Sequence, residues 1–226
     1  MIIYIIFGVI TLASWLVQRS LTNKFNKYSR VPLDAPLTGA QVAELMLEQN
    51  GIHQVVVQSV GGQLTDHYNP ANCTVNLSQP VYGANSVAAA AVAAHECGHV
   101  LQHAKGYSML NLRTKLVPAV SFASQWLTWV LLGGILLFEV FPYLFYLAIA
   151  LFAITTLFSL VTLPVEIDAS RRAIAWLDTA GITRGENTVM ARDALKSAAY
   201  TYVVSALGSL ATLVYYVLMA LGGRRS

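Results

Sequence analysis

Four long apolar segments constrain this chain more than any other feature of its sequence. Residues 2–17, 119–138, 143–163 and 198–221 contain no charged side chain. A helix needs about 20 apolar residues to cross the hydrocarbon core of a bilayer, so three segments have full length and the first is slightly short. Only 11% of all residues are charged, against about 25% in soluble domains. The sequence therefore predicts a membrane protein with about four transmembrane helices.

Basic residues predict the orientation of these helices. They follow the first apolar segment (Arg19, Lys24, Lys27, Arg30) and separate the third from the fourth (Arg171, Arg172, Arg184, Arg192, Lys196). The positive-inside rule places both regions in the cytoplasm, with Arg224 and Arg225 as the exception. The first segment lacks a basic n-region, so we expect an uncleaved anchor over residues 1–18 rather than a signal peptide. The chain has no basic run interleaved with aromatic residues, which argues against nucleic acid as a partner.

Residues 31–117 have the pattern of a water-exposed α+β domain. Thr38 and Gln41 form a capping-box pattern that opens a helix ending at Gly51. Residues 52–60, 64–68 and 74–77 are predicted strands, with a turn at 69–72. A helix is expected over 86–104, capped by Asn85 or Ser86 and followed by Gly106. A small sheet should thus precede this helix, whose alanine-rich start is too short to span a membrane.

The sequence His95-Glu96-Cys97-Gly98-His99 lies in this predicted helix. Residues four apart share a helix face, so His95 and His99 can bind one metal ion while Glu96 reaches a water molecule beside it. A buried structural helix gains little from such polar groups unless each has a partner. Cys97 is expected to point away from the histidines as a small buried hydrophobe. The pattern predicts a catalytic zinc site, and the two cysteines do not indicate a disulfide framework.

A catalytic zinc ion usually has three protein ligands, so a third must come from elsewhere. His103 follows on the same helix, but one straight helix rarely supplies three ligands. His67 at the end of a strand is a second candidate. Glu166 is the strongest candidate, because it follows Pro164, which is expected to start a new helix, and returns to the side of the membrane that holds His95. Asp168 can orient a ligand or cap the helix, and Ser170 shares a face with Glu166.

These segments predict five regions. They are an anchor (1–18), a zincin-like domain (31–117), a transmembrane hairpin (118–163), the helix of the third ligand (164–197) and a last transmembrane helix (198–221).

The chain resembles the YugP family of neutral zinc metallopeptidases, which are bacterial membrane proteins. The matching segments are Leu64–Pro70, Ala93–Tyr107 and Leu163–Arg172. The resemblance covers nearly the whole chain and implies a gluzincin-like peptidase with one zinc ion, the ligands His95, His99 and Glu166, and Glu96 as general base. The order of elements is also similar to that of HtpX-type and prenyl-protein proteases, which carry an aspartate where Ser170 stands. We therefore expect a protein of the bacterial plasma membrane whose site faces the cytoplasm.

Further site residues are expected from this chemistry. The oxyanion needs a donor besides the metal, and His67, Tyr68 and Arg171 are candidates. The strand residues Cys73, Thr74, Val75, Asn76 and Leu77 are candidates for pairing with an extended peptide or membrane-protein substrate. Two alternatives remain: an intramembrane zinc protease of the site-2 type, for which Asp178 is the nearest candidate ligand, and a membrane scaffold that holds zinc without catalysis.

Overall fold

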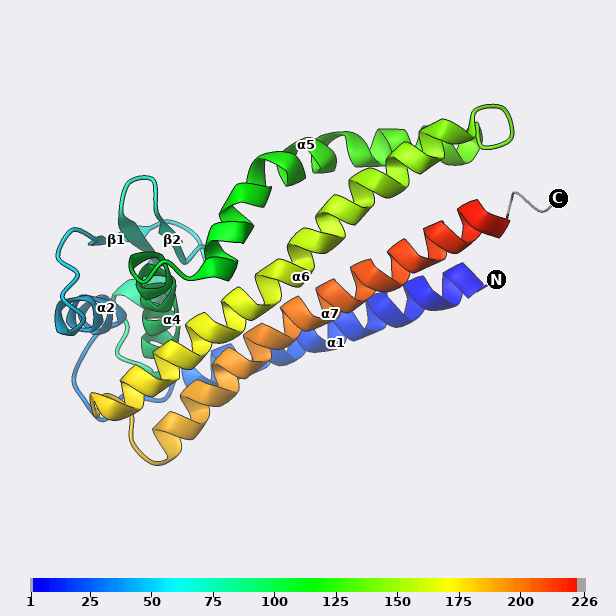
Figure 1. Ribbon diagram of the computed structural model, residues 1–226. Coiled ribbons are helices and arrows are strands. Elements are labelled where there is room, and N and C mark those ends of the chain that lie inside the picture. Colours follow the sequence, from blue (N-terminus) through cyan, green and yellow to red (C-terminus); the bar gives the residue numbers. More distant parts are fainter. Residues whose placement is uncertain (1, 223–226) are drawn as a thin grey trace. The chain divides into compact units, whose positions relative to one another are not determined.

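The computed structural model describes residues 2–222, with side chains from residue 4 onward. The chain forms two compact units. The sheet unit comprises Leu16–Tyr107 and Val165–Tyr200, and the helical unit comprises Met1–Trp15, Ser108–Pro164 and Thr201–Ser226. Figure 1 gives the order of the elements along the chain. The expected α+β class is confirmed, because a small sheet accompanies a largely helical chain.

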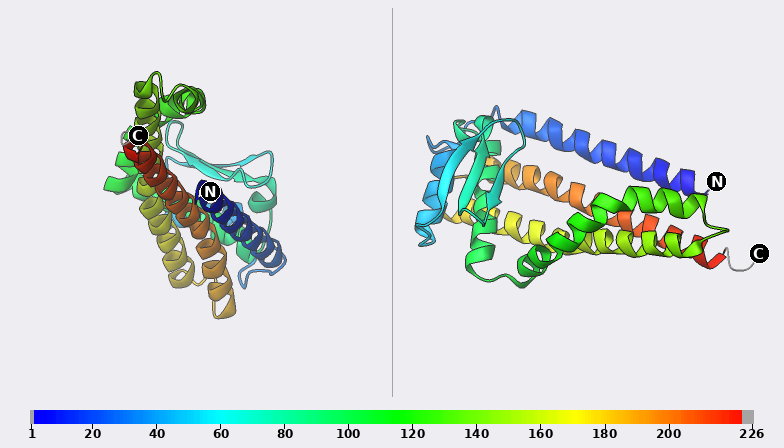
Figure 2. Two further views of the ribbon diagram at one scale, coloured as in Figure 1. Left: turned by 90° about the vertical axis from the view of Figure 1, so that its right-hand side faces the viewer. Right: turned by 90° about the horizontal axis from the view of Figure 1, so that it is seen from above.

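The sheet unit contains a three-stranded mixed sheet. Strands β1 (Val56–Val60), β2 (His67–Asn69) and β3 (Thr74–Ser78) lie in the order β1-β3-β2, and Figure 2 shows them side by side. β1 pairs with β3 in parallel, whereas β2 pairs with β3 antiparallel through Tyr68 opposite Val75. All five residues of β3 are buried. β3 is therefore the centre of the sheet, and β1 and β2 are its edges.

Three helices pack with this sheet. Helix α2 (Gly39–Gln49) begins with the predicted capping box, in which the Thr38 side chain accepts from the Gln41 backbone. The short α3 (Gln79–Tyr82) leads to α4 (Val87–Ala104), whose N-cap Ser86 accepts from the Ala89 backbone N–H. The alanine-rich first half of α4 is buried in the core of the unit. Small side chains allow the neighbouring elements to pack closely around α4, and this packing holds the helix in a fixed position.

The remaining segments of the sheet unit come from long helices. They are the ends of α1 (Ile2–Tyr28) and α6 (Pro142–Thr179) and the start of α7 (Glu186–Gly222). Ala173 and Leu177 of α6 and Leu195 of α7 join the same core as α4. Asp193 of α7 accepts hydrogen bonds from the Tyr28 hydroxyl and the Lys24 ammonium, both at 2.7 Å. These contacts fix the α1 and α7 segments within the unit.

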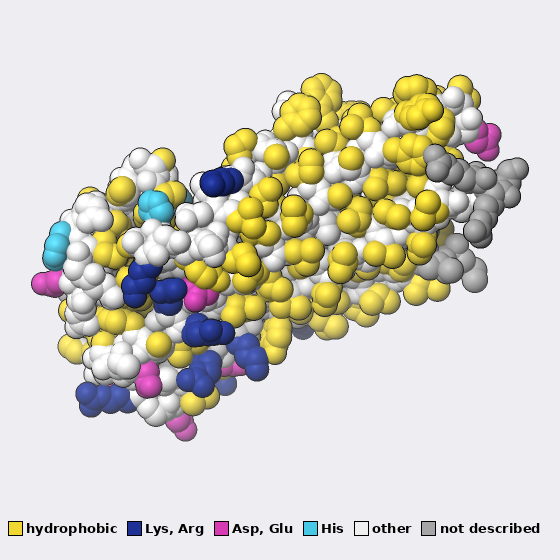
Figure 3. All heavy atoms as spheres, in the orientation of Figure 1, with side chains coloured by type: hydrophobic (Ala, Val, Ile, Leu, Met, Phe, Trp, Pro, Cys, Tyr) yellow, Lys and Arg dark blue, Asp and Glu magenta, His cyan; other side chains and the backbone are white. Residues whose placement is uncertain are grey.

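The helical unit contains α5 (Ser108–Leu136) and the apolar parts of α1, α6 and α7. Phe145 of α6 packs edge to face against Tyr216 of α7, with ring centroids 6.0 Å apart. Figure 1 shows α5 bent, and Pro118 within it removes one backbone hydrogen bond. Apolar side chains cover the visible surface of this unit in Figure 3, and Trp129 is 71% exposed. Helices α1, α5, α6 and α7 are long and apolar enough to cross a membrane, so this is an α+β membrane protein.

Several element boundaries differ from the sequence-based expectation. Pro164 does not start a helix but lies inside the continuous α6. A long helix tolerates the loss of one N–H because its other backbone hydrogen bonds persist. The strand expected at residues 64–68 begins only at His67, because Leu64 has a left-handed φ of 58°. Helix α1 continues beyond residue 18 to Tyr28. Arg224 and Arg225 lie outside the described residues.

Candidate metal centre

The two histidines of α4 lie one helical turn apart with their rings in contact. The ring centroids of His95 and His99 are 4.8 Å apart and the planes are nearly perpendicular. Their side chains are 14% and 11% exposed. The spacing of four residues places both on one face of α4, as the sequence predicts.

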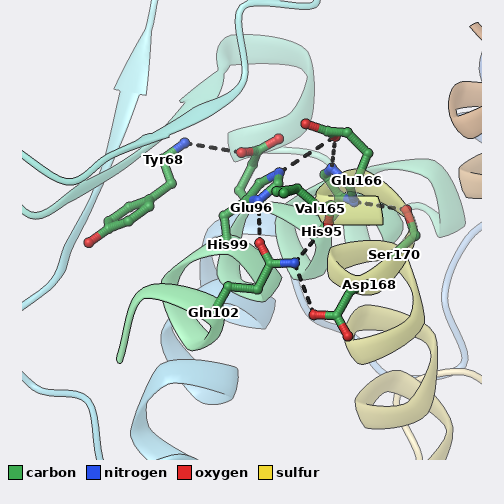
Figure 4. Close-up of polar contacts among 9 residues, drawn as sticks. All are labelled: Tyr68, His95, Glu96, His99, Gln102, Val165, Glu166, Asp168 and Ser170. Carbon is green, nitrogen blue, oxygen red and sulfur yellow. Dashed lines mark hydrogen bonds and ion pairs between the residues drawn. The ribbon is translucent and has the colours of Figure 1, made fainter. Parts of the chain in front are cut away.

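Glu166 of α6 completes a group with these histidines (Figure 4). Its Oε2 lies 3.3 Å from His95 Nε2 and 3.6 Å from His99 Nε2. One donor atom from each of the three residues lies within 4.8 Å of the others. Within residues 2–222 no other three His, Cys, Asp or Glu side chains gather in this way. Glu166, which the sequence favours as the third candidate ligand, is therefore the one beside the histidines.

Gly98 explains how α6 comes so close to α4. A Cβ atom at this position would lie 2.6 Å from the Ala169 carbonyl oxygen and 3.1 Å from its Cα. Real Cβ atoms do not approach backbone this closely, so only glycine permits the present packing. Ala169 is one turn from Glu166 on α6, and Gly98 is next to His99. The glycine within the histidine motif thus permits the close approach of the two helices that carry the candidate ligands.

Two separations within the group match those of a tetrahedral zinc ion. With bonds of about 2.0–2.1 Å, two ligand atoms at the tetrahedral angle are separated by about 3.3 Å. The two Glu166–imidazole separations, 3.3 and 3.6 Å, are close to that value. Two imidazoles and one carboxylate form a common donor set of catalytic zinc sites, and three protein ligands leave the fourth position for water or substrate.

The far side of each imidazole has a polar partner. His95 Nδ1 lies 3.1 Å from the Ser170 hydroxyl, and His99 Nδ1 lies 3.0 Å from Gln102 Oε1. Asp168 does not contact a histidine; its Oδ2 accepts from Gln102 Nε2 and from Arg172 Nε. Sequence reasoning singled out Ser170 and Asp168 but missed Gln102. The available signal was its position three residues after His99 on the same face of α4.

Glu96 is buried beside the group, with 8% of its surface exposed. Its Oε2 accepts a hydrogen bond of 3.0 Å from the backbone N–H of Tyr68 in β2. Figure 4 shows this contact on the opposite side of Glu96 from the α6 helix. The edge strand β2 therefore orients the carboxylate of Glu96.

The electrostatics of the site favour a positive charge. Burial, the largest influence, lowers the pKa of His99, but contacts with Glu166 and the charges of Glu96 and Glu166 together raise it above its ordinary value. Two carboxylates near two imidazoles thus form an environment suited to a cation.

The predicted oxyanion donors lie in other contacts. His67 Nδ1 is 2.7 Å from the Thr65 carbonyl, and the Tyr68 hydroxyl is 3.0 Å from His103 Nδ1. The Arg171 side chain is exposed. The backbone of Tyr68 therefore contacts Glu96. The contacts of the Tyr68 and His67 side chains are with residues other than His95 and His99. His103, bonded to Tyr68, lies outside the metal-ligand group, as does His67.

The prediction that Cys73, Thr74, Val75, Asn76 and Leu77 pair with a substrate strand is wrong. Residues 74–78 form the central strand β3, which pairs with β1 along its whole length and with β2 along Thr74–Asn76. Both edges of Thr74–Asn76 are therefore occupied by neighbouring strands, which leaves no edge there for another chain. Cys73 precedes the strand with a φ of 53° and is half-buried. The edge strand beside Glu96 is β2.

The structure also bears on the alternative sites. Asp178 accepts a hydrogen bond from the Thr188 hydroxyl and is not part of the metal-ligand group. Cys97 is fully buried, and its Sγ lies 3.6 Å from the Ala43 carbonyl. Burial and the charge of Glu96 raise the pKa of its thiol. Cys97 therefore behaves as the expected buried hydrophobe and contributes no metal ligand.

Comparison with known proteins identifies the family to which the chain belongs. Residues 3–221 match the model of a family described as "Putative neutral zinc metallopeptidase". The chain is 41% identical over 222 residues to a protein named "Putative membrane protease YugP" from Bacillus subtilis (strain 168), covering 98% of this chain and 97% of that protein. No solved structure matches the chain. The family match spans nearly the full length and includes all three candidate ligands, so the chain belongs to this family of neutral zinc metallopeptidases.

Proposed function

We propose that this protein is a membrane-bound zinc endopeptidase in which His95, His99 and Glu166 hold one zinc ion and Glu96 is the general base. The observation that carries the proposal is the convergence of the three donor atoms within 4.8 Å of one another, next to a buried fourth carboxylate. A structural zinc site usually has four protein ligands, often cysteines. A set of three without cysteine favours catalysis over the scaffold alternative.

Each residue of the site has its own role in the proposed hydrolysis of a peptide bond. Zinc in such a site supplies Lewis-acid activation of water and of the scissile carbonyl. Glu96 accepts the proton of the attacking water and delivers it to the leaving amine. The Tyr68 N–H holds the Glu96 carboxylate at the side of the site. Burial of Glu96 and Glu166 limits competition from bulk water for both carboxylates.

The substrate is proposed to lie along β2. This strand pairs with β3 through only one of its two edges, and the Tyr68 N–H on the other edge points to Glu96. An extended peptide that adds to this edge would pass the general base. The substrates are then unfolded or extended segments of peptides or of membrane proteins.

We further propose that the site faces the cytoplasm at the plasma membrane of a bacterium. Support comes from the basic residues near the ends of the apolar segments (Arg19, Lys24, Arg172, Arg192, Lys196). In inverted membrane vesicles, a membrane-impermeant maleimide should modify Cys73. Modification of Cys73 in intact cells would instead place the sheet unit outside.

Substitution of the proposed base tests the enzymatic proposal. The full-length Glu96→Gln variant, purified in detergent, should keep one zinc ion per chain and lose at least about 100-fold of its peptidase activity, because the amide cannot accept the proton. Hydrolysis of a quenched-fluorescence peptide library and metal analysis measure the two quantities. Glu44→Gln changes an exposed glutamate of α2 and is the matched control. Activity that survives in Glu96→Gln at the level of this control would rule out Glu96 as the base.

A further inference from the structure

Gln102 is a fully buried amide with three polar contacts, one to His99 within α4 and two that join α4 to α6. Its Oε1 lies 3.0 Å from His99 Nδ1, and its Nε2 lies 2.7 Å from the Val165 carbonyl and 2.9 Å from Asp168 Oδ2. No part of its surface is exposed. Figure 4 shows the amide below His99, with its nitrogen directed towards α6.

We infer that Gln102 is a positioning residue of the metal centre, which fixes the tautomer of His99 and ties the peptide carrying Glu166 to α4. The inference rests on the proposed metal site but assigns a role to a residue outside its ligand set. It follows from the hydrogen-bonding capacity of each atom in the chain of contacts.

The surroundings determine the orientation of the Gln102 amide. The Val165 carbonyl and the Asp168 carboxylate are both acceptors, so the atom between them must be the NH₂ group with its two protons. If the amide were reversed, its carbonyl oxygen would face two acceptors, and both hydrogen bonds donated by the NH₂ group would be lost. Oε1 is therefore the atom next to His99.

An acceptor at this position determines the tautomer of His99. Because Gln102 Oε1 only accepts, His99 Nδ1 must carry the proton, and the neutral ring then presents the lone pair of Nε2 to the site. That lone pair faces Glu166 Oε2 at 3.6 Å. A bound metal ion between these two acceptors would satisfy both of them. Gln102 thus prepares the nitrogen that binds the metal.

The same amide acts on the second helix. Val165 is adjacent to Glu166, so the hydrogen bond from Gln102 to its carbonyl holds this part of the α6 backbone against α4. Asp168 acts through Gln102 rather than on a ligand, and its carboxylate is held by Arg172 Nε at 2.6 Å. The chain of contacts runs from His99 to an ion pair near the surface of the unit.

His95 has a different kind of partner. The Ser170 hydroxyl near its Nδ1 can donate or accept, so it adapts to either tautomer. The amide of Gln102, whose nitrogen is committed to two acceptors, cannot. Loss of Gln102 should therefore affect metal binding more than loss of the Ser170 hydroxyl.

The test measures metal affinity and tautomer in the full-length protein in detergent. Gln102→Leu should weaken zinc binding about 10–100-fold in competition with a chromophoric chelator, the range typical for partners of metal ligands. Thr183→Val removes another fully buried polar group of the sheet unit and should bind zinc as wild type does. Asp168→Leu should weaken zinc binding in the wild type but have no further effect in Gln102→Leu, because it acts through the amide.

A spectroscopic measurement keeps the inference testable if Gln102→Leu does not fold. In ¹⁵N-histidine spectra of the zinc-loaded wild type, His99 should carry its proton on Nδ1. A proton on Nε2, or unchanged zinc affinity in a folded Gln102→Leu, would overturn the inference while leaving the metallopeptidase proposal intact. Failure of the wild type to bind zinc at all would instead contradict the proposed function.

Discussion

The Gly98→Ala substitution tests whether the spacing between α4 and α6 controls the metal site. The new Cβ would lie 2.6 Å from the Ala169 carbonyl oxygen, whereas ordinary van der Waals contact begins at 3.4 Å. The helices must therefore separate locally by about 0.8 Å, because the obstructing atoms belong to the backbone and cannot rotate away. Glu166 lies one turn from Ala169 and would move with it.

Two opposing terms determine the size of the effect. Alanine is more favourable than glycine in a helix interior by about 1 kcal/mol. Overpacking of a well-packed core costs about 1–3 kcal/mol. We expect a net loss of about 0–2 kcal/mol in stability of the metal-free protein. The effect on zinc should be larger, because metal–ligand distances tolerate only about 0.2 Å and a displacement of about 0.8 Å removes or strains the Glu166 bond. A tenfold or greater loss of affinity corresponds to about 1.4 kcal/mol or more.

The assay combines zinc competition with a chelator and thermal unfolding of the metal-free protein. Gly8→Ala is the matched control, because Gly8 also lies within a helix but a Cβ atom added there would have no neighbouring atom within 4 Å. This control should bind zinc normally and unfold at the same or a slightly higher temperature. If Gly98→Ala binds zinc within about twofold of the wild type and unfolds no earlier than Gly8→Ala, the spacing argument is refuted.

Other substitutions and reagents test the remaining assignments. Glu166→Gln should lose zinc at chelator concentrations that leave Glu96→Gln loaded, because a neutral amide is a weak zinc ligand; equal retention would remove Glu166 from the ligand set. Maleimide should modify Cys73 but not Cys97 in the folded protein even at pH 9, because burial raises the pKa of the Cys97 thiol and so keeps it protonated at that pH. Rapid labelling of Cys97 in a Cys73→Ser variant, followed by mass spectrometry, would contradict its burial.

The features that sequence reasoning found correctly depend on local chemistry. The capping box of Thr38 and Gln41 involves residues three apart, and the cap of α4 lies at Ser86, one of the two predicted positions. The spacing of His95 and His99 determines their common face in any α-helix. Such features need no knowledge of the tertiary fold, because the interacting atoms are brought together by one helical turn.

The strand order shows where local reasoning fails. Periodicity indicates that residues 74–77 form a strand. Its position in the centre of the sheet depends on pairing with Val56–Val60, eighteen residues earlier in register. The sequence alone favours the last strand before α4 as the edge that a substrate would join. The parallel crossover from β1 to β3 instead leaves the shorter β2 at that edge. A hairpin alone does not specify which strand a third segment will join.

Glu166 and Gln102 show the same limit within the site. The charge distribution predicts that the region after the third apolar segment returns to the side of the histidines, and this prediction suffices to favour Glu166. No charge pattern of this kind identifies Gln102. Its partners Val165 and Asp168 lie more than sixty residues away in the sequence and come into contact with it only when the two helices pack. The local hints are its position three residues after His99 and the nearby Gly98, whose missing side chain permits the contact. A small residue between two metal ligands on a helix therefore predicts that another helix approaches closely. A polar residue one turn after the second ligand is then a candidate hydrogen-bond partner for that ligand.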